Sequence, residues 1–126
     1  MDLEKLKSIS TAKAVKKGTI LIREGDTETA SSMYIVLKGQ VTVSKNFRQN
    51  NAVQLAKLGS GDFVGEMSLF LSESRTATAV ATEDSIVLEI TNNNVYEILS
   101  SNPEFAYSMM VTLCERVQSA NKKIKP

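Results

Sequence analysis

Three glycines, a glutamate and an arginine gather in residues 59–80, which read GSGDFVGEMSLFLSESRTATAV. Gly59, Gly61 and Gly65 permit positive φ and let the main chain pass close to a ligand. The apolar spacing of GEMSLFL predicts one or two helical turns. The first N–H groups of such a turn have no intrahelical acceptor and, together with the helix dipole, favour an anion. This stretch therefore predicts a phosphate site.

Two charged residues of the same stretch narrow the ligand. Arg75 follows Glu66 by nine positions (75 − 66) and can return as a bidentate clamp on the same phosphate, with the Thr76 hydroxyl beside it. A carboxylate only accepts hydrogen bonds, so Glu66 beside a phosphate requires a hydroxyl donor such as a ribose 2′-OH. Together these residues predict a ligand with both a phosphate and a free ribose hydroxyl.

The same residues have simpler interpretations when they are taken singly. Glycine-rich turns join strands in many proteins that bind nothing there. A glutamate and an arginine close in sequence more often form a surface ion pair worth about 0–1 kcal/mol than a binding site. The order and spacing of the whole stretch favour the ligand site over both alternatives.

Composition limits the classes of protein to consider. The 126 residues suffice for one domain with its own core. The 15 basic and 14 acidic side chains give a net charge of +1, which gives no support for a nucleic-acid binder. One cysteine, Cys114, and the absence of histidine exclude an intrachain disulfide, histidine-dependent catalysis and metal sites built on clustered Cys and His. We therefore expect no enzyme, no metal and no cofactor.

The apolar runs also bear on location. None approaches the roughly 20 residues of a membrane-spanning helix. The first ten residues, MDLEKLKSIS, lack the apolar core of a signal peptide. We therefore expect a cytoplasmic protein without membrane contact.

The elements that position the charged stretch follow from the hydrophobic pattern. Leu3, Leu6 and Ile9 predict a short amphipathic helix over 1–17, packed as a cap on the domain. Over 18–90, short apolar runs with turns between them predict strands in TILI, MYIVLKGQVTVS, VQLAKL and ATAVATEDSIVLEI. Gly39 is expected to divide the second run at a tight corner. Strands of this number and length favour a mainly β jelly-roll-type barrel or sandwich.

The run VQLAKL and the segment before it each give a further structural expectation. Val53, Leu55 and Leu58 are expected to pack inward from VQLAKL. The segment KNFRQNN before it predicts a hairpin tip. Phe47 and Arg48 at this tip favour an exposed loop over a partner contact.

From residue 91 the period becomes helical. Val95, Ile98 and Leu99 indicate one helix, and Asn102 followed by Pro103 indicates the start of another. The apolar stripe expected on the last helix comprises Phe105, Met109, Leu113, Val117, Ala120 and Ile124. The basic residues toward its end are interpreted as complementing the helix dipole, in preference to contacting nucleic acid: Arg116, Lys122, Lys123 and Lys125. Tyr107, Met109 and Met110 favour core or dimer contacts over a lid on a flat aromatic ligand.

With its motifs in this order, the chain resembles the cyclic nucleotide-binding domain family, over about residues 3–117. The resemblance rests on GTILIREGD, MYIVLKGQVTV, LGSGDFVGEMSL and SRTATAV, followed by two closing helices. It implies a β-roll, or double-stranded β-helix, closed by an N-terminal helix and two C-terminal helices. The domain organisation expected is a single domain over 1–126, with the helix at 1–17, the roll at 18–90 and the closing helices at 91–126. Residues 59–80 resemble the phosphate-binding cassette of this family, and the name cassette is kept for them below.

The resemblance also implies roles for particular residues. Glu66 accepts a hydrogen bond from the ribose 2′-OH, and Arg75 pairs with the cyclic phosphate. The remaining ligand-binding positions implied by the family are Gly65, the amides of Met67 and Ser68, Thr76 and Ala77 at the phosphate pocket, Leu69 as a mobile apolar hinge, and Val43 and Leu55 as apolar surface for the ligand.

Three positions depart from the family pattern or bear on the choice of base. Ser74 stands where proline is usual, which implies a less rigid loop and a lower affinity. Ser68 replaces the common alanine or glycine, a small change that fits. Thr76 points weakly to cGMP, but bacterial-like members with Ser or Thr there can prefer cAMP. We expect cAMP to be favoured, with cGMP as the alternative.

The sequence thus predicts a non-catalytic sensor that binds a cyclic nucleoside monophosphate and repositions its C-terminal helices. The alternative is an interaction or dimerisation domain of the same fold whose pocket is vestigial or takes another small ligand. A homodimer through the last helix, or a separate effector protein, is the expected protein partner. Direct nucleic-acid contact is not expected, because the nine residues after Val117 (126 − 117) are too few for a helix-turn-helix.

Overall fold

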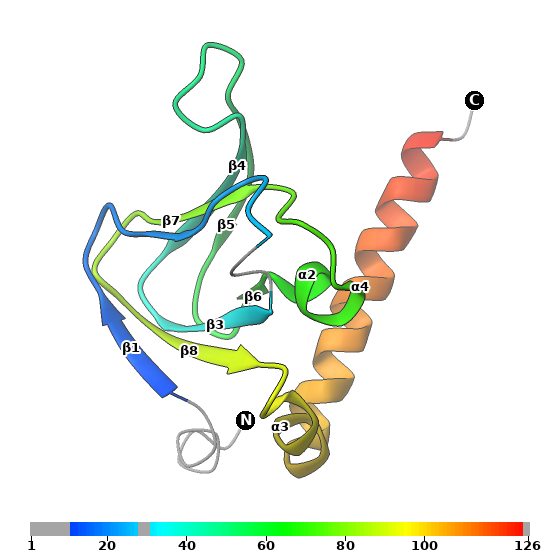
Figure 1. Cartoon of the computed structure of the whole chain (residues 1–126). Helices are drawn as coiled ribbons and strands as arrows, with labels where there is room; N and C mark the ends of the chain where they lie inside the picture. The colour runs from blue at the N-terminus through cyan, green and yellow to red at the C-terminus, as the bar shows by residue number, and fades with distance from the viewer. Residues whose placement is uncertain (1–10, 28–30, 125–126) are drawn as a thin grey trace.

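Two four-stranded antiparallel sheets form the body of the molecule in a computed structural model, which describes residues 11–27 and 31–124 (Figure 1). In spatial order the first sheet contains β1 (Thr11–Val15), β8 (Ser85–Thr91), β3 (Ser32–Lys38) and β6 (Phe63–Val64). The second contains β2 (Ile20–Ile22), β7 (Thr78–Ala81), β4 (Val41–Lys45) and β5 (Val53–Leu58). The strands roll over one another, and the prediction of a mainly β, jelly-roll-like β-roll is confirmed.

Within the first sheet, β3 is buried on both faces, which explains why it reads as an unbroken apolar run. Met33 and Ile35 point to the helices, whereas Tyr34 and Val36 point to the second sheet. The helix-side core consists of Met33, Ile35, Phe63, Leu69, Leu88, Ile90, Ile98, Phe105 and Met109. The core between the sheets consists of Ile22, Tyr34, Val36, Val41, Leu58, Ala79 and Val87.

The corner between β3 and β4 requires glycine for two reasons. Gly39 has a φ of 99°, which side-chain-bearing residues rarely adopt. A Cβ at this position would lie 2.7 Å from the Asp84 carbonyl oxygen and would also collide with Ser85. The prediction of a tight corner at Gly39 is confirmed.

A bulge shapes the pairing of β4 with β5. Val43 pairs with Ala56 and Ser44 with Gln54, so that Leu55 has no partner across the ladder. Leu58 is buried as predicted, but Val53 is 53% exposed. The expectation that Val53 packs inward is wrong, because it lies beyond the bulge, at the end of the strand nearest the hairpin tip.

The described part of the chain contains three helices: α2 (Glu66–Leu71) lies between β6 and β7, and α3 (Val95–Ser101) and α4 (Pro103–Ile124) follow β8. They cover the outer face of the first sheet through Leu69, Ile98, Phe105 and Met109 (Figure 1). Along α4 the predicted apolar stripe remains in contact with the core as far as Leu113. Val117 is 59% exposed and Ala120 is also exposed, so the stripe prediction is wrong beyond Leu113, and the side chain of Ile124 lies outside the description. None of the helices described here combines the length and apolar character needed to cross a membrane.

The predicted N-terminal helix is wrong in its last part. Thr11–Val15 form β1, which pairs with β8 from Thr11 opposite Glu89 to Val15 opposite Ser85. This pairing with a distant strand overrides the local helical pattern. Leu3, Leu6 and Ile9 belong to residues 1–10, which lie outside the described part of the chain.

Candidate functional site

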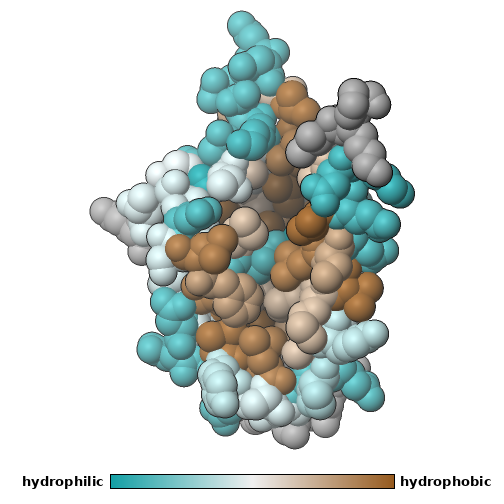
Figure 2. All heavy atoms as spheres, turned by 90° about the vertical axis from the view of Figure 1, so that its right-hand side faces the viewer, coloured by the Kyte–Doolittle hydropathy of each residue, from teal (hydrophilic) through white to brown (hydrophobic). Residues whose placement is uncertain are grey.

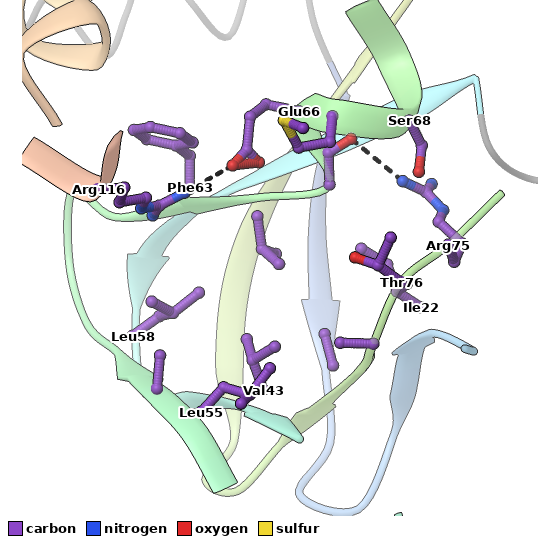
Figure 3. A pocket seen from close by; sticks show the side chains of 16 residues that line it. Ile22, Val43, Leu55, Leu58, Phe63, Glu66, Ser68, Arg75, Thr76 and Arg116 are labelled. Atoms are coloured by element: carbon purple, nitrogen blue, oxygen red, sulfur yellow. Dashed lines mark hydrogen bonds and ion pairs between the residues drawn. The ribbon is translucent and has the colours of Figure 1, made fainter. Parts of the chain in front are cut away.

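A cavity of about 410 Å³ lies between the second sheet and the start of α2 (Figure 3). Nine of the ten residues expected to bind a ligand line it: Val43, Leu55, Gly65, Glu66, Met67, Ser68, Arg75, Thr76 and Ala77. The other lining residues are Ile22, Ala56, Leu58, Phe63, Val64, Ala79 and Arg116. The structure therefore brings the two ends of the cassette and the two β-strand positions to one place.

Gly65 fixes the entry into α2. It has a φ of 93° at the N-cap, where no side chain caps the helix. A Cβ there would lie 2.8 Å from Arg75 Nη1 and 3.0 Å from Ile22 Cδ1. The first intrahelical bond runs from the Leu69 N–H to the Gly65 carbonyl oxygen at 3.3 Å, so the earlier amides have no acceptor within the helix. Glycine at this position thus permits both the turn and the close approach of Arg75.

The main chain of Arg75 is fixed to the turn between β2 and β3. Its N–H donates to the Asp26 carbonyl oxygen at 2.9 Å, and its carbonyl oxygen accepts from the Gly25 N–H at 2.7 Å. This reciprocal pair holds the loop after α2 against a neighbouring segment. Ser74 lies just before this pair in an irregular segment, and its predicted effect on loop rigidity stays a prediction.

Two oxygen atoms in the described part of the chain accept hydrogen bonds from the side chain of Arg75. Nη1 donates to the Gly65 carbonyl oxygen at 3.2 Å, and Nη2 donates to Ser32 Oγ at 3.3 Å. Only 3% of the residue is exposed. Burial lowers the pKa of the Arg75 guanidinium, and the neighbouring Tyr34 and two carboxylates oppose that effect. An arginine remains a cation under such conditions, so the cavity has a fixed positive group at this end.

Glu66 lies at the other end of the cavity and is paired with a residue of α4. Its Oε1 accepts from Arg116 Nη1 at 2.6 Å, while Glu66 is only 5% exposed (Figure 3). The Arg116 guanidinium also lies 5.0 Å from the centre of the Phe63 ring, a cation–π contact. The last helix therefore reaches the predicted ribose position through one side chain.

Arg116 is a charged residue of the cavity lining that the sequence interpretation missed, because it was assigned to the helix dipole. A usable signal exists, since Arg116 follows Leu113 by three residues and Met109 by seven. Residues at these spacings share one side of a helix, and here that side faces the roll.

The floor between the charged ends is apolar. It is formed by Ile22, Val43, Leu55, Leu58 and Ala79. Leu55 contributes although it is 53% exposed, since the bulge in β5 turns it toward the opening. A cavity with a cation, a carboxylate and an apolar floor suits a ligand with an anionic group, a hydroxyl group and a flat apolar part.

Several expected residues lie elsewhere. Leu69 does not line the cavity but is buried in the helix-side core, and its role as a mobile hinge in ligand binding stays a prediction. Met109 is in the same core, as favoured. Tyr107 and Met110 are 68% and 57% exposed and do not line the cavity, which contradicts the lid alternative. In residues 11–27 and 31–124, no cluster of three or more His, Cys, Asp or Glu side chains is placed to hold a metal ion.

Known proteins resemble this chain in both sequence and structure. It is 30% identical over 98 residues to the cAMP-activated global transcriptional regulator CRP of Haemophilus influenzae, which covers 77% of this chain and 44% of the relative. The crystal structure of the Thermus thermophilus catabolite activator protein superposes with a TM-score of 0.82 at 25% identity, over 97% of this chain and 56% of that one. A structure described as cAMP-bound PfPKA-R gives a TM-score of 0.65 at 28% identity, over 75% of this chain and 33% of that one. This chain spans about half the length of the curated relatives it matches.

The family model described as "Cyclic nucleotide-binding domain" matches residues 12–102. That range contains the whole cassette and all nine predicted residues that line the cavity, since these lie between Val43 and Ala77. The chain belongs to the cyclic nucleotide-binding domain family.

Proposed function

We propose that this domain is a non-catalytic sensor that binds a cyclic nucleoside monophosphate, with cAMP favoured over cGMP. The observation that carries the proposal is that Glu66 and Arg75 border one cavity with an apolar floor. The names of the relatives support it, since one is cAMP-activated and a similar structure is described as cAMP-bound. The cavity volume of about 410 Å³ lies in the range of small-molecule sites, about 300–1,000 Å³.

Each end of the cavity suits one part of such a ligand. The guanidinium of Arg75 and the first amides of α2, at Met67 and Ser68, provide donors for the cyclic phosphate. The carboxylate of Glu66 provides an acceptor for the ribose 2′-OH. Val43 and Leu55 provide apolar surface for the base.

The ion pair between Glu66 and Arg116 gives a route from the ligand to α4. A ribose hydroxyl that binds Glu66 shares or displaces the hydrogen bond that Arg116 now makes at 2.6 Å. The ligand then interacts differently with two positions of α4, which is the condition for a ligand to shift a conformational equilibrium. We propose that α4 and its neighbours are the output of the sensor.

Isothermal titration calorimetry tests the binding. We expect one molecule of cAMP per chain, and a loss of affinity of about a hundredfold in Arg75→Ala, since hydrogen bonds to charged groups contribute about 1.5–3 kcal/mol each. Glu66→Gln is expected to weaken cAMP binding less, because the amide still accepts a hydrogen bond. The exposed residues Arg23 and Glu97 provide the matched controls Arg23→Ala and Glu97→Gln, which should bind as the wild type does. Absence of binding of both cAMP and cGMP at millimolar concentration would refute the proposal.

Competition between cAMP and cGMP in one titration series tests the choice of base. Preference for cAMP is expected, and Thr76→Ala is expected to weaken cGMP more than cAMP. A preference for cGMP would reverse this part of the proposal and leave the sensor role intact.

A second candidate function, dimerisation through α4, is favoured by the apolar surface of the helices. Figure 2 shows apolar side chains gathered on the face that carries α2 and α4. The exposed apolar residues of these helices are Met67, Phe70, Leu71, Tyr107, Met110, Val111 and Val117. Along α4, Tyr107, Met110, Cys114, Val117 and Asn121 alternate at spacings of three and four, the a and d pattern of a coiled coil. We propose that two copies pair in parallel along this seam.

The solution mass tests dimerisation independently of the ligand. Val117→Asp is expected to convert a dimer to a monomer, whereas Ser119→Asp, on the opposite side of the helix, should not. Cys114 is exposed and lies at an a position, so mild oxidation should join two copies covalently. A monomeric wild type at high micromolar concentration would contradict the proposal.

The activity of a longer protein that contains this domain is a separate matter. The relatives named above include a transcriptional regulator, and this chain spans about half of such relatives. The expectation of no direct nucleic-acid contact therefore concerns this chain alone. An effector protein contacted by α4 and a cytoplasmic location complete the proposal.

A further inference from the structure

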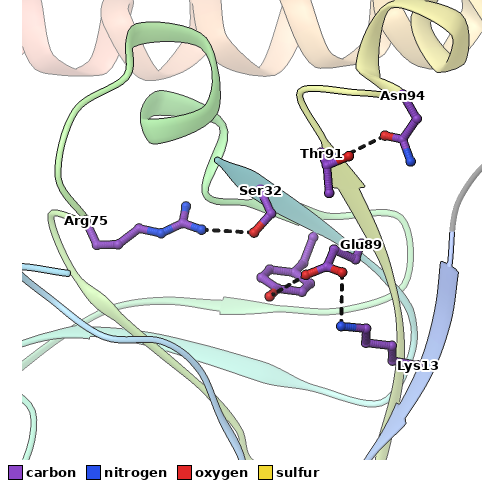
Figure 4. A network of polar contacts seen from close by, with 7 residues as sticks. Lys13, Ser32, Arg75, Glu89, Thr91 and Asn94 are labelled. Atoms are coloured by element: carbon purple, nitrogen blue, oxygen red, sulfur yellow. Dashed lines mark hydrogen bonds and ion pairs between the residues drawn. The ribbon is translucent and has the colours of Figure 1, made fainter. Parts of the chain in front are cut away.

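A line of polar side chains leads away from Arg75 between the two sheets and is not part of the cavity. Figure 4 shows Arg75 directed to Ser32 and, further along, Glu89 directed to Lys13. Arg75 Nη2 donates to Ser32 Oγ at 3.3 Å. The Tyr34 hydroxyl donates to Glu89 Oε2 at 3.1 Å, and Lys13 Nζ lies 3.0 Å from Glu89 Oε1. Ser32 and Tyr34 lie two positions apart on one face of β3, and hydrogen bonding by Ser32 acts to lower the pKa of the Tyr34 phenol.

The direction of every hydrogen bond in this line is determined by which groups can donate. A guanidinium has no acceptor, so Ser32 Oγ must accept from Arg75. An ionised carboxylate has no donor, so the Tyr34 hydroxyl must donate to Glu89. Ser32 retains one proton to donate, and Tyr34 is its neighbour on the same face of β3. A Ser32 lone pair therefore points toward Arg75, and the Tyr34 proton points toward Glu89.

We infer that Ser32 and Tyr34 are positioning residues, which hold the guanidinium of Arg75 in the orientation that binds the ligand's phosphate. This inference rests on the proposed function, since it concerns the same phosphate site. Ser32 anchors Nη2 while the Gly65 carbonyl oxygen anchors Nη1, so two atoms define the plane of the guanidinium. Tyr34 orients the Ser32 hydroxyl, and the ion pair of Glu89 with Lys13 terminates the line at β1.

Burial makes this arrangement effective. Ser32 is 6% exposed and Tyr34 8% exposed, so that water does not readily replace either of them. Hydrogen bonds in a low-dielectric environment polarise one another, and the negative charge of Glu89 strengthens each acceptor toward Arg75. A side chain fixed before the ligand arrives loses less conformational freedom on binding. The line thereby raises the affinity for phosphate without touching the ligand.

The decisive experiment compares ligands with and without the phosphate. In Ser32→Ala, we expect the affinity for cAMP to fall about tenfold, the effect of one hydrogen bond to a charged group. Adenosine has the same base and ribose but no phosphate, and its affinity should change by less than about twofold, since it does not use the charge of Arg75. Tyr34→Phe should cause a smaller loss of affinity for cAMP and leave the affinity for adenosine almost unchanged. Ser32→Thr keeps a hydroxyl at this position and should therefore keep most of the wild-type affinity for cAMP.

A double-mutant cycle separates positioning from general destabilisation. In the Arg75→Ala background, Ser32→Ala should cause no further loss of affinity for cAMP, because residues that act through one another are not additive. Ser85 is also buried and hydrogen-bonded, at 4% exposure, and Ser85→Ala is the matched control. It is expected to lower the melting temperature and to leave the affinity for cAMP unchanged. Equal losses for cAMP and adenosine, or additive losses in the Arg75→Ala background, would overturn the inference.

A ligand-free measurement distinguishes failure of this inference from failure of the proposed function. In protein with isotope-labelled arginine, the side-chain nuclear magnetic resonance signals of Arg75 should broaden or shift in Ser32→Ala and Tyr34→Phe but not in Ser85→Ala. If the wild type bound no cyclic nucleotide but the Arg75 signals still changed in Ser32→Ala, the sensor proposal would be refuted and the positioning of Arg75 would be supported. If the wild type bound cAMP but the Arg75 signals did not change in Ser32→Ala, the positioning inference would be refuted and the sensor proposal would be supported.

Discussion

Gly65 is the residue whose replacement tests the geometry of the site most directly. Gly65→Ala is expected to destabilise the fold by about 1–2 kcal/mol through its positive φ alone. It is also expected to abolish high-affinity binding of cAMP, because the new Cβ would lie 2.8 Å from Arg75 Nη1 and displace the guanidinium. Chemical denaturation and calorimetric titration measure the two effects.

A matched glycine separates strain from contact. Gly18 has a φ of 94°, and a Cβ there would meet no atom within 4 Å. Gly18→Ala should therefore lower the stability and leave the affinity for cAMP unchanged. If both variants bound cAMP as the wild type does, Gly65 would have no role in placing Arg75.

Tyr34 has an expected signature at alkaline pH. Burial, the first cause, and the nearby Glu89 raise the pKa of its phenol above the ordinary value of 10.0. Because the folded pKa lies above the unfolded one, its contribution to stability is fully present below the unfolded pKa and is lost as the pH rises through the folded pKa. The difference between ultraviolet titrations of the wild type and Tyr34→Phe should show a midpoint above 10.0. Tyr96, which is 83% exposed, provides Tyr96→Phe as the comparison, and a Tyr34 midpoint at or below the ordinary value would contradict the prediction.

Individual residues were predictable where the chemistry is local. Gly65, Glu66 and Arg75 lie within eleven consecutive positions, and their types already specify a turn, an acceptor and a cation. Arg116 was not found, because its partner Glu66 lies 50 positions earlier and only the packing of α4 brings them together. A basic residue near the end of a helix is already explained by the helix dipole, so the sequence alone gave no reason to look for an ion pair between Arg116 and Glu66.

At the scale of elements, α4 offers two adjacent residues in opposite environments. Met109 is 4% exposed in the helix-side core, whereas Met110 is 57% exposed. Met109→Ala should destabilise the fold by about 2–5 kcal/mol, the usual effect of removing a buried methionine side chain. Met110→Ala should change the stability of the monomeric fold by less than about 0.5 kcal/mol. Urea denaturation at low protein concentration measures both, and similar losses would show that α4 packs differently.

The elements that sequence predicted well are those whose burial pattern is local. The run MYIVLKGQVTV indicated two strands and a corner, because Gly39 interrupts an otherwise β-branched and aromatic segment. The segment TAKAV was assigned to a helix, because nothing near it signals a strand. Its pairing partner, β8, begins 70 positions after Val15 (85 − 15), so the information that makes it a strand is not local.

At the scale of the whole molecule, ligand binding and folding are linked. If only the folded state binds cAMP, then cAMP at a hundred times its Kd stabilises the fold by about 2.7 kcal/mol. For a domain of this size, that corresponds to a rise in melting temperature of roughly 10 °C. Scanning calorimetry should show this rise for the wild type and for Arg23→Ala, but not for Arg75→Ala. A rise that persisted in Arg75→Ala would place the bound nucleotide elsewhere.

The topology of the sheets has a consequence for synthesis of the chain. Thr11 of β1 pairs with Glu89 of β8, 78 positions later (89 − 11). At a ribosomal rate of about 5–20 residues per second, β1 waits roughly 4–16 s before the last residue of its pairing register has been made. During that interval its backbone N–H and C=O groups are an open edge, available to any other strand. The nascent chain is therefore open to misassembly at β1, the strand that the sequence pattern predicted to be helical.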